Sequence, residues 1–271
     1  MPRVPAIETR NLRIGYTSRT GERIVHPDLN LKLFAGEVTA LLGRNGAGKS
    51  TLLRTLCGLQ PALSGTILIE GRLLGNYTPG ELSAKVGIVL TEQTHAGGIT
   101  VYELVSLGRY PHTGFFGTLG ESDHEVIRLA IRSVGLSDKQ ERYVAELSDG
   151  ERQKTFIAKT LAQECPIILL DEPTAFLDIT SRIETMVTLR ALAHRQHKAI
   201  LLSTHDLDTA LQLADRLWLQ PAFDPATGEA GPMVCGTTED LVADGSLSRF
   251  FGSDTLTFDP ATRRLIARNE K

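Results

Sequence analysis

Apolar residues recur at two different spacings along the chain, and the changes of spacing divide it into three segments. Between Gln93 and Leu147 the spacing is helical, whereas after Asp171 strands and helices alternate, which favours a parallel sheet covered by helices. Before this middle segment, short runs that alternate or are continuously apolar between Gly and Pro residues predict a β-rich, antiparallel start. These runs are Ile7–Ile14, Leu29–Leu33, Val38–Leu42 and Thr66–Glu70.

Start signals place several helices within this pattern. The middle segment predicts a helix over Thr100–Leu107 and another over Ser122–Val134, the latter opened by a capping box from Ser122 to Glu125. A second capping box, from Ser148 to Glu151, opens a helix over Gly150–Gln163. Further elements are expected at Val86–Leu90, Ile179–His194, Ala199–Ser203, Leu207–Ala214 and Arg216–Gln220. The sequence Phe-Asp-Pro-Ala-Thr occurs twice, at Phe223–Thr227 and Phe258–Thr262, and both occurrences are interpreted as turns.

Composition narrows the class of protein. The chain has 271 residues, 41% of them hydrophobic, and a formal charge of −3, so it has no basic footprint for nucleic acid. No apolar run approaches the roughly 18 residues that cross a bilayer, and Met1–Pro5 lacks a signal-peptide core, so we expect a cytosolic chain. Cys57, Cys165 and Cys235 have no metal-site spacing and are expected to be reduced core residues.

One loop carries the first chemical signal. Gly43–Ser50 reads Gly-Arg-Asn-Gly-Ala-Gly-Lys-Ser and fits G-x-x-x-x-G-K-[ST], between an apolar strand at Val38–Leu42 and a helix at Thr51–Cys57. Such glycines let backbone N–H groups turn toward a polyphosphate, Lys49 would reach its β- and γ-phosphates, and Ser50 would ligate Mg²⁺. The residues expected to bind nucleotide here are Gly43, Asn45, Gly46, Gly48, Lys49, Ser50 and Thr51.

A pair of carboxylates supplies the second signal. Asp171 and Glu172 follow the apolar run Ile167–Leu170, at the strand end where open parallel sheets bind ligands. Two carboxylates at a strand end would by themselves be interpreted as solvated. Together with the phosphate loop, they predict that Asp171 holds Mg²⁺ and that Glu172 polarises the water that attacks the γ-phosphate.

The segment Leu147-Ser148-Asp149-Gly150-Glu151 lies between these two motifs. With it, residues 6–245 resemble the nucleotide-binding subunit of ATP-binding-cassette (ABC) transporters, whose signature is commonly Leu-Ser-Gly-Gly-Gln. The resemblance implies an α/β phosphate-loop NTPase of ABC type: a RecA-like mixed sheet core, an antiparallel β subdomain and an inserted helical subdomain at about 95–165. It also implies one domain over residues 1–245 and a tail extension over 246–271.

In the resembled family two subunits dimerise head to tail, so Ser148 and Gly150 would contact the γ-phosphate bound by the other subunit. Asp149 and Glu151 depart from the family pattern and bring negative charge toward a phosphate. Because acidic residues also suit the first turn of a helix, we expect both side chains to point away from ATP.

Other positions match family residues in order. Tyr16 matches the aromatic that stacks on adenine, although an exposed tyrosine at a strand end is also common. Gln93 matches the glutamine that contacts Mg²⁺ and the attacking water. Asp178 matches the loop that crosses the dimer interface, and His205 matches the histidine that hydrogen-bonds the γ-phosphate.

The segment Val101–His112 is similar to ATPases of the importer branch that takes up iron–siderophore, haem and cobalamin, and its Gly-Arg-Tyr-Pro-His stretch carries the likeness. Ordinary helix termination would also explain this stretch. The resemblance implies a homodimer on the cytoplasmic face of the cell membrane, transmembrane permease subunits as partners and, indirectly, an extracytoplasmic substrate-binding protein. An ABC exporter ATPase and a non-transport ABC ATPase with a soluble partner remain alternatives.

Overall fold

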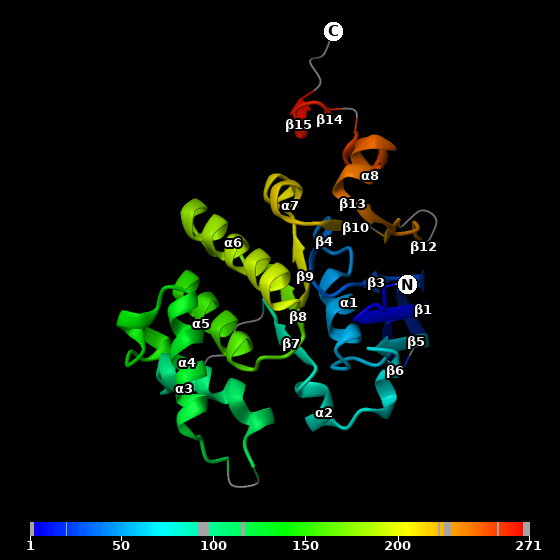
Figure 1. Ribbon diagram of the computed structural model, residues 1–271. Coiled ribbons are helices and arrows are strands. Elements are labelled where there is room, and N and C mark those ends of the chain that lie inside the picture. Colours follow the sequence, from blue (N-terminus) through cyan, green and yellow to red (C-terminus); the bar gives the residue numbers. More distant parts are fainter. Residues whose placement is uncertain are drawn as a thin grey trace.

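A six-stranded sheet forms the centre of the computed structural model, which describes residues 3–19, 21–91, 98–114, 117–221, 223–224, 229–253 and 255–267. The strand order is β13-β10-β4-β9-β8-β7, and only β13 runs antiparallel to its neighbour among these described strands (Figure 1). Their bounds are β4 Glu37–Gly43, β7 Val86–Val89, β8 Ile167–Asp171, β9 Ala199–Thr204, β10 Arg216–Gln220 and β13 Val234–Thr237.

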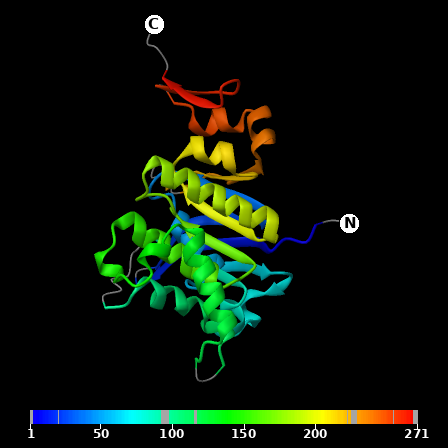
Figure 2. The ribbon, with the colours of Figure 1, turned by 60° about the vertical axis from the view of Figure 1, so that its left-hand side comes forward.

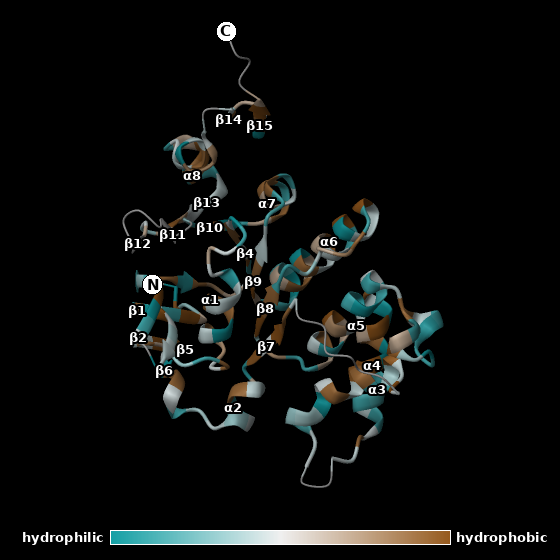
Figure 3. Cartoon of the chain, turned by 180° about the vertical axis from the view of Figure 1, so that it is seen from behind, coloured by the Kyte–Doolittle hydropathy of each residue, from teal (hydrophilic) through white to brown (hydrophobic). Residues whose placement is uncertain are grey.

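Both faces of this sheet are buried, which explains the continuous apolar runs of its strands. On β4, Ala40 and Leu42 belong to the core under helices α6 (Ile179–Gln196) and α7 (Leu207–Leu213). Leu41 belongs to the opposite core, which includes residues of helix α1 (Lys49–Leu56). Figures 1 and 2 show α6 lying along one face of the sheet, and Figure 3 shows the apolar strands at the centre.

A second sheet is antiparallel and covers the α1 side. It pairs β2 (Gly21–Leu29), β1 (Ile7–Ser18), β5 (Ser64–Ile69) and β6 (Arg72–Leu73) in that order, with β3 (Lys32–Leu33) also on β1. The prediction of one strand over Leu29–Leu33 was wrong, because the Thr9 hydroxyl accepts the N–H of Leu31 at 2.8 Å and interrupts the ladder. Placing Val38–Leu42 in the antiparallel segment was also wrong, since it lies in β4.

The middle segment forms a helical lobe with its own apolar core. Its helices are α3 (Val101–Ser106), α4 (Glu121–Ser133) and α5 (Asp149–Ala162), and Leu107–His112 forms a 3₁₀-helix after α3. The predicted Ser122 capping box was wrong. Helix α4 starts one residue earlier, because the Asp123 carboxylate accepts the Gly120 N–H at 2.9 Å.

The last part of the chain packs on the same core as α6. It comprises α8 (Thr238–Ala243), α9 (Ser246–Phe251) and a hairpin of β14 (Leu256–Asp259) with β15 (Arg264–Ala267). Leu247 and Phe258 are both buried there, and the expected boundary after residue 245 stays a prediction. Helix α2 (Pro79–Ser83) and the pair β11 (Phe223–Asp224) and β12 (Glu229–Ala230) are also present, and short 3₁₀-helices form at Leu74–Asn76, Ser137–Lys139 and Val144–Glu146.

The structure also shows the turn after Phe258 and the positions of the three cysteines. Phe258 lies within β14, which ends at Asp259, and the Asp259 carboxylate accepts the Ala261 N–H at 3.0 Å in the turn that follows. Cys57 and Cys165 are buried as expected, but Cys235 is exposed because it lies on β13 at the edge of the sheet. Within the described ranges, no helix combines the length and apolarity needed to cross a membrane.

Candidate functional site

The loop between β4 and α1 is shaped by two glycines in left-handed backbone conformations. Gly46 has φ 81° and Gly48 has φ 95°, values that L side chains adopt only under strain. A Cβ on Gly48 would lie 2.1 Å from Cγ1 of Val25 on β2, whereas a Cβ on Gly46 would meet nothing within 4 Å. Gly48 therefore also permits the close approach of the antiparallel sheet to the loop.

The loop lysine is held beneath this turn. Lys49 is only 6% exposed, and its ammonium donates to the carbonyl of Gly43 at 2.9 Å. It also lies 3.6 Å from Oε1 of Glu172. A buried cation at the start of α1, next to the positive end of the helix dipole, makes this place suited to a polyphosphate.

The two acidic residues at the end of β8 are fixed by a hydroxyl from the next strand. Ser203 on β9 donates to Oδ1 of Asp171 at 2.6 Å, and its Oγ accepts the N–H of Glu172 at 2.9 Å. Ser203 pairs with Asp171 in the parallel register, which brings these groups together. Asp171 is 3% exposed, and its second carboxylate oxygen has no hydrogen bond to any described residue.

Glu172 has an unusual backbone. Its φ is 47°, a conformation that costs a non-glycine residue of order 1–3 kcal/mol and is tolerated where the surroundings impose it. Nδ1 of His205, just after β9, lies 3.3 Å from Oε2 of Glu172. The carboxylate of Glu172 is therefore flanked by Lys49 on one side and His205 on the other.

The phosphate loop, Asp171 and Glu172 line a cleft of about 620 Å³, within the size range of small-molecule sites. At its edge the Tyr16 hydroxyl is 2.7 Å from Oγ1 of Thr51, which fixes a half-exposed ring beside α1. The described residues that line the cleft are Tyr16, Arg23, Val25, Asn45, Gly46, Gly48, Lys49, Ser50, Thr51, Thr91, Asp171 and Glu172.

Some predicted site residues lie elsewhere. Three predicted residues, Ser148 and Gly150 at the start of α5 and Asp178 at the start of α6, are not among the described residues lining the cleft. His205 does not line it either, although it contacts Glu172. Gly43 borders the loop without lining the cleft, and a Cβ there would lie 2.8 Å from the Gln220 carbonyl. Gln93 falls outside the described residues.

The expected capping box at Ser148 is confirmed. Ser148 and Glu151 exchange side-chain and backbone hydrogen bonds, and the Glu151 carboxylate also pairs with Lys139. The Lys139 ammonium, aided by the Ser148 N–H, lowers the pKa of Glu151 from its ordinary value. Asp149 pairs with Arg152 at 3.0 Å. Both acidic side chains of the signature are thus bound within their own chain.

Two positioning residues were missed by the sequence reasoning. Ser203 bridges the acidic pair, and buried Gln220 donates to the carbonyl of Ala47 in the loop at 2.7 Å. Each stands near the carboxyl end of a parallel strand, the edge where ligand sites gather. A search for polar residues at these strand ends would have found both.

The sequence of this chain matches a known protein family. The family model described as ABC transporter matches residues 27–175, more than half of the chain. The chain belongs to the ABC transporter family. It is an ABC-type transport ATPase, a protein that binds and hydrolyses ATP, and the predicted fold class is confirmed.

Relatives extend over most of the chain. The iron(3+)-hydroxamate import ATP-binding protein of Bacillus subtilis is 35% identical over 98% of this chain and 97% of its own length. The ferric enterobactin transport ATP-binding protein of Escherichia coli is 33% identical, covering 94% and 90%. The cobalamin import ATP-binding protein of Halobacterium salinarum is also 33% identical, covering 91% and 68%.

The fold of this chain is similar to solved structures of ABC transporter proteins. A metal-chelate type ABC transporter in an inward-facing conformation superimposes with a TM-score of 0.74 at 28% identity, over 91% of this chain and 89% of that chain. The dimeric structure of a bacterial ABC transporter cassette gives 0.74 at 25% identity, over 84% and 97%.

Proposed function

We propose that this chain is the ATP-hydrolysing subunit of a membrane importer that drives uptake of an iron chelate or cobalamin through a separate permease. The observation that carries the proposal is the cleft lined by the phosphate loop and the acidic pair, with His205 next to Glu172, in a chain whose relatives are named for import of ferric siderophores and cobalamin. Haem, the third cargo implied by the sequence resemblance, stays within the proposal.

The cleft supports a division of roles. Lys49 would exchange the Gly43 carbonyl and Glu172 for phosphate oxygens, while Glu172 would polarise the attacking water and His205 would bind the γ-phosphate. The Tyr16 ring would stack on the adenine. The proposal also includes contacts with the nucleotide by Asn45, Gly46, Gly48 and Thr51. It further includes a contact of Gln93 with the attacking water.

Mg²⁺ fits the donor set of this cleft. Asp171 keeps one buried carboxylate oxygen without a hydrogen bond to the described residues, and Ser50 offers a hydroxyl in the same cleft. Both are hard oxygen donors of the kind that Mg²⁺ prefers. We assign them, with Gln93, to holding the ion, which would neutralise phosphate charge during hydrolysis.

A homodimer would complete the site. Ser148 and Gly150 lie outside their own cleft, so a second copy would have to supply them to the bound ATP. A Cβ on Gly150 would lie 3.1 Å from the Phe176 carbonyl, which places the signature beside the loop that ends at Asp178. Phe176 and Ile179 in this region are 46% and 74% exposed, and exposed apolar residues of this kind suit a protein contact.

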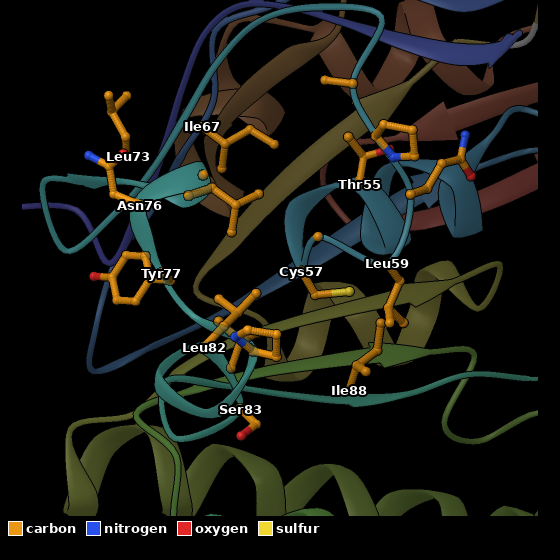
Figure 4. Close-up of a pocket in the computed structure, with 18 of the residues that line it drawn as sticks. Thr55, Cys57, Leu59, Ile67, Leu73, Asn76, Tyr77, Leu82, Ser83 and Ile88 are labelled. Carbon is orange, nitrogen blue, oxygen red and sulfur yellow. The ribbon is translucent and has the colours of Figure 1, made fainter.

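The permease would bind at a groove between the core and the helical lobe. The groove has a volume of about 850 Å³, and it is lined by residues from the end of α1 to β7 and by residues at the C-terminal end of α5 (Figure 4). Leu59 and Ile88 lie at one end of the close-up and Leu73 and Tyr77 at the other. Because Gln93 follows β7, movement at this groove and at the ATP site would be coupled. The chain would then sit on the cytoplasmic face of the membrane.

The proposal can be tested with native membranes. The tagged chain is purified in mild detergent, and the copurifying permease is reconstituted in proteoliposomes with wild-type or Glu172→Gln chain. MgATP should drive movement of labelled ferric siderophore or cobalamin from the binding-protein side to the ATPase side in the wild type alone. Outward movement would establish an exporter, and capture of a soluble partner without a permease would establish a non-transport ATPase.

A further inference from the structure

The groove contains one charge in an otherwise uncharged lining. Of the described residues that line it, only Lys159 carries a formal charge, and most of the others are apolar or glycine. Lys159 lies on α5, one turn before Gln163, which lines the same wall. A cation on the wall of an apolar groove selects among the segments that could bind there.

Among the described residues, the ammonium of Lys159 is unpaired. No hydrogen bond or ion pair joins it to any residue in the described part of the chain. Burial lowers the pKa of this ammonium from its ordinary value. Burial raises the pKa of Cys165 to about 11, so the thiol is neutral at pH 7 and supplies no counter-charge.

The end of α5 that carries Lys159 is held firmly. A Cβ on Gly108 would lie 2.2 Å from the Lys159 carbonyl, so the 3₁₀-helix packs directly against this turn. Arg109 donates to the carbonyl of Ala162 at 2.7 Å, and Gln163 donates to the carbonyls of Ser83 and Val86 across the groove. The ammonium is therefore presented from a fixed backbone.

An occupant of the groove would remove water from this ammonium. A buried cation without a partner is strongly unfavourable, so the occupant must bring an acceptor. A carboxylate matches the charge and forms the stronger, charge-assisted hydrogen bond. The apolar remainder of the lining suits the apolar face of a short helix.

We propose that Lys159 determines partner specificity by pairing with a carboxylate on an apolar helical segment of the permease. This inference rests on the proposed function, since the permease is its partner. Helix α5 begins at the signature, with Ser148 as its N-cap, and carries Lys159 near its other end. The ion pair would thus attach the permease to the same helix that presents Ser148 to the second copy.

Binding to the copurified permease in detergent tests the proposal. Lys159→Gln should weaken the complex by about tenfold or more, whereas Lys159→Arg should stay within about threefold of wild type. Arg132→Gln is the matched control, because Arg132 is exposed on α4 and does not line the groove. The basal ATPase rate and thermal midpoint of the free chain should be unchanged in all three. Raising salt from about 0.05 to about 0.5 M should weaken the wild-type complex more than that of Lys159→Gln.

A charge exchange identifies the partner group. Lys159→Glu should lose binding, and one carboxylate-to-lysine change in the cytoplasm-facing loops of the permease should restore it. Equal binding by wild type and Lys159→Gln, or failure of every such exchange, would overturn the inference while leaving the importer proposal intact. A wild-type chain that retains no permease would overturn the importer proposal itself.

Discussion

Replacing Ser203 by alanine should damage both stability and turnover. The hydroxyl makes one hydrogen bond to the Asp171 carboxylate and accepts one from the Glu172 N–H. A hydrogen bond to a charged group contributes about 1.5–3 kcal/mol and a neutral one about 0.5–1.5 kcal/mol, so Ser203→Ala should lower the free energy of unfolding by about 2–4.5 kcal/mol.

Thr39 provides a matched control on the neighbouring strand. Its hydroxyl is equally buried, but it has no hydrogen-bond partner in the described part of the chain. Thr39→Val should therefore leave the free energy of unfolding unchanged or raise it by up to about 1–3 kcal/mol. Trp218 is the only tryptophan, is buried, and pairs with Leu41 of β4, so its fluorescence in a denaturant titration reports on this sheet.

The kinetic effect of Ser203→Ala follows from the strained backbone of Glu172. Without the hydroxyl, the residue can leave its φ of 47°, and misplacement of a reacting group by about 1 Å costs on the order of 100-fold in rate. We expect kcat for ATP to fall about 10- to 100-fold while KM changes less than about threefold. Equal unfolding free energies for the two variants, or a large rise in KM with normal kcat, would refute the reasoning.

Four further outcomes are expected. Glu172→Gln should lower ATP turnover by about 10²–10⁴-fold without loss of nucleotide binding and should trap a dimer in size-exclusion chromatography; near-normal turnover would move the general-base role elsewhere. Gly48→Ala should destabilise the chain by about 2–4 kcal/mol, but Gly46→Ala by only about 1–2 kcal/mol, because only the former adds a steric clash; equal shifts of the thermal midpoint would contradict this. Arg109→Met leaves two carboxylates without their shared cation and should cost the helical lobe about 3 kcal/mol, measured by hydrogen exchange in α4 and α5. Glu151→Gln keeps the cap but removes the ion pair with Lys139, which should lower the free energy of unfolding by about 0.5–1 kcal/mol. Because the folded-state pKa of Glu151 is lowered, the stabilisation by this ion pair is complete above about pH 4.3 and is lost in more acid solution. The free energies of unfolding of the two proteins should therefore converge at low pH.

Local patterns were sufficient to predict much of this molecule. The phosphate loop, the acidic pair and His205 each follow directly after an apolar run that forms a strand of the central sheet. Their positions in the sequence therefore predict that they lie at the same edge of this sheet. The Ser148 capping box is likewise a contact between residues three apart. The structure brings the predicted Lys49, Glu172 and His205 together as neighbours.

Other features depend on partners that are distant in sequence. Ser203 faces Asp171 only because β9 pairs with β8 in one particular register. Helix α4 starts at Glu121 because Asp123 caps Gly120 and binds Arg109 at 2.8 Å, and no spacing rule favours that cap over Ser122. The proposed contact of Ser148 and Gly150 with ATP requires a second copy, and the sequence of one chain does not position a second molecule.

The order of strands in the central sheet has a consequence for how the chain is made. Strand β4 ends in the phosphate loop, yet its two neighbours, Ala199–Thr204 and Arg216–Gln220, are translated more than a hundred residues later. A fold with such non-local pairing forms slowly, and an apolar strand with unpaired edges invites aggregation meanwhile. During synthesis, the segment that will bind ATP must therefore be kept from other nascent chains until most of the sequence has left the ribosome. The cassette cannot assemble its nucleotide site progressively from the N-terminus.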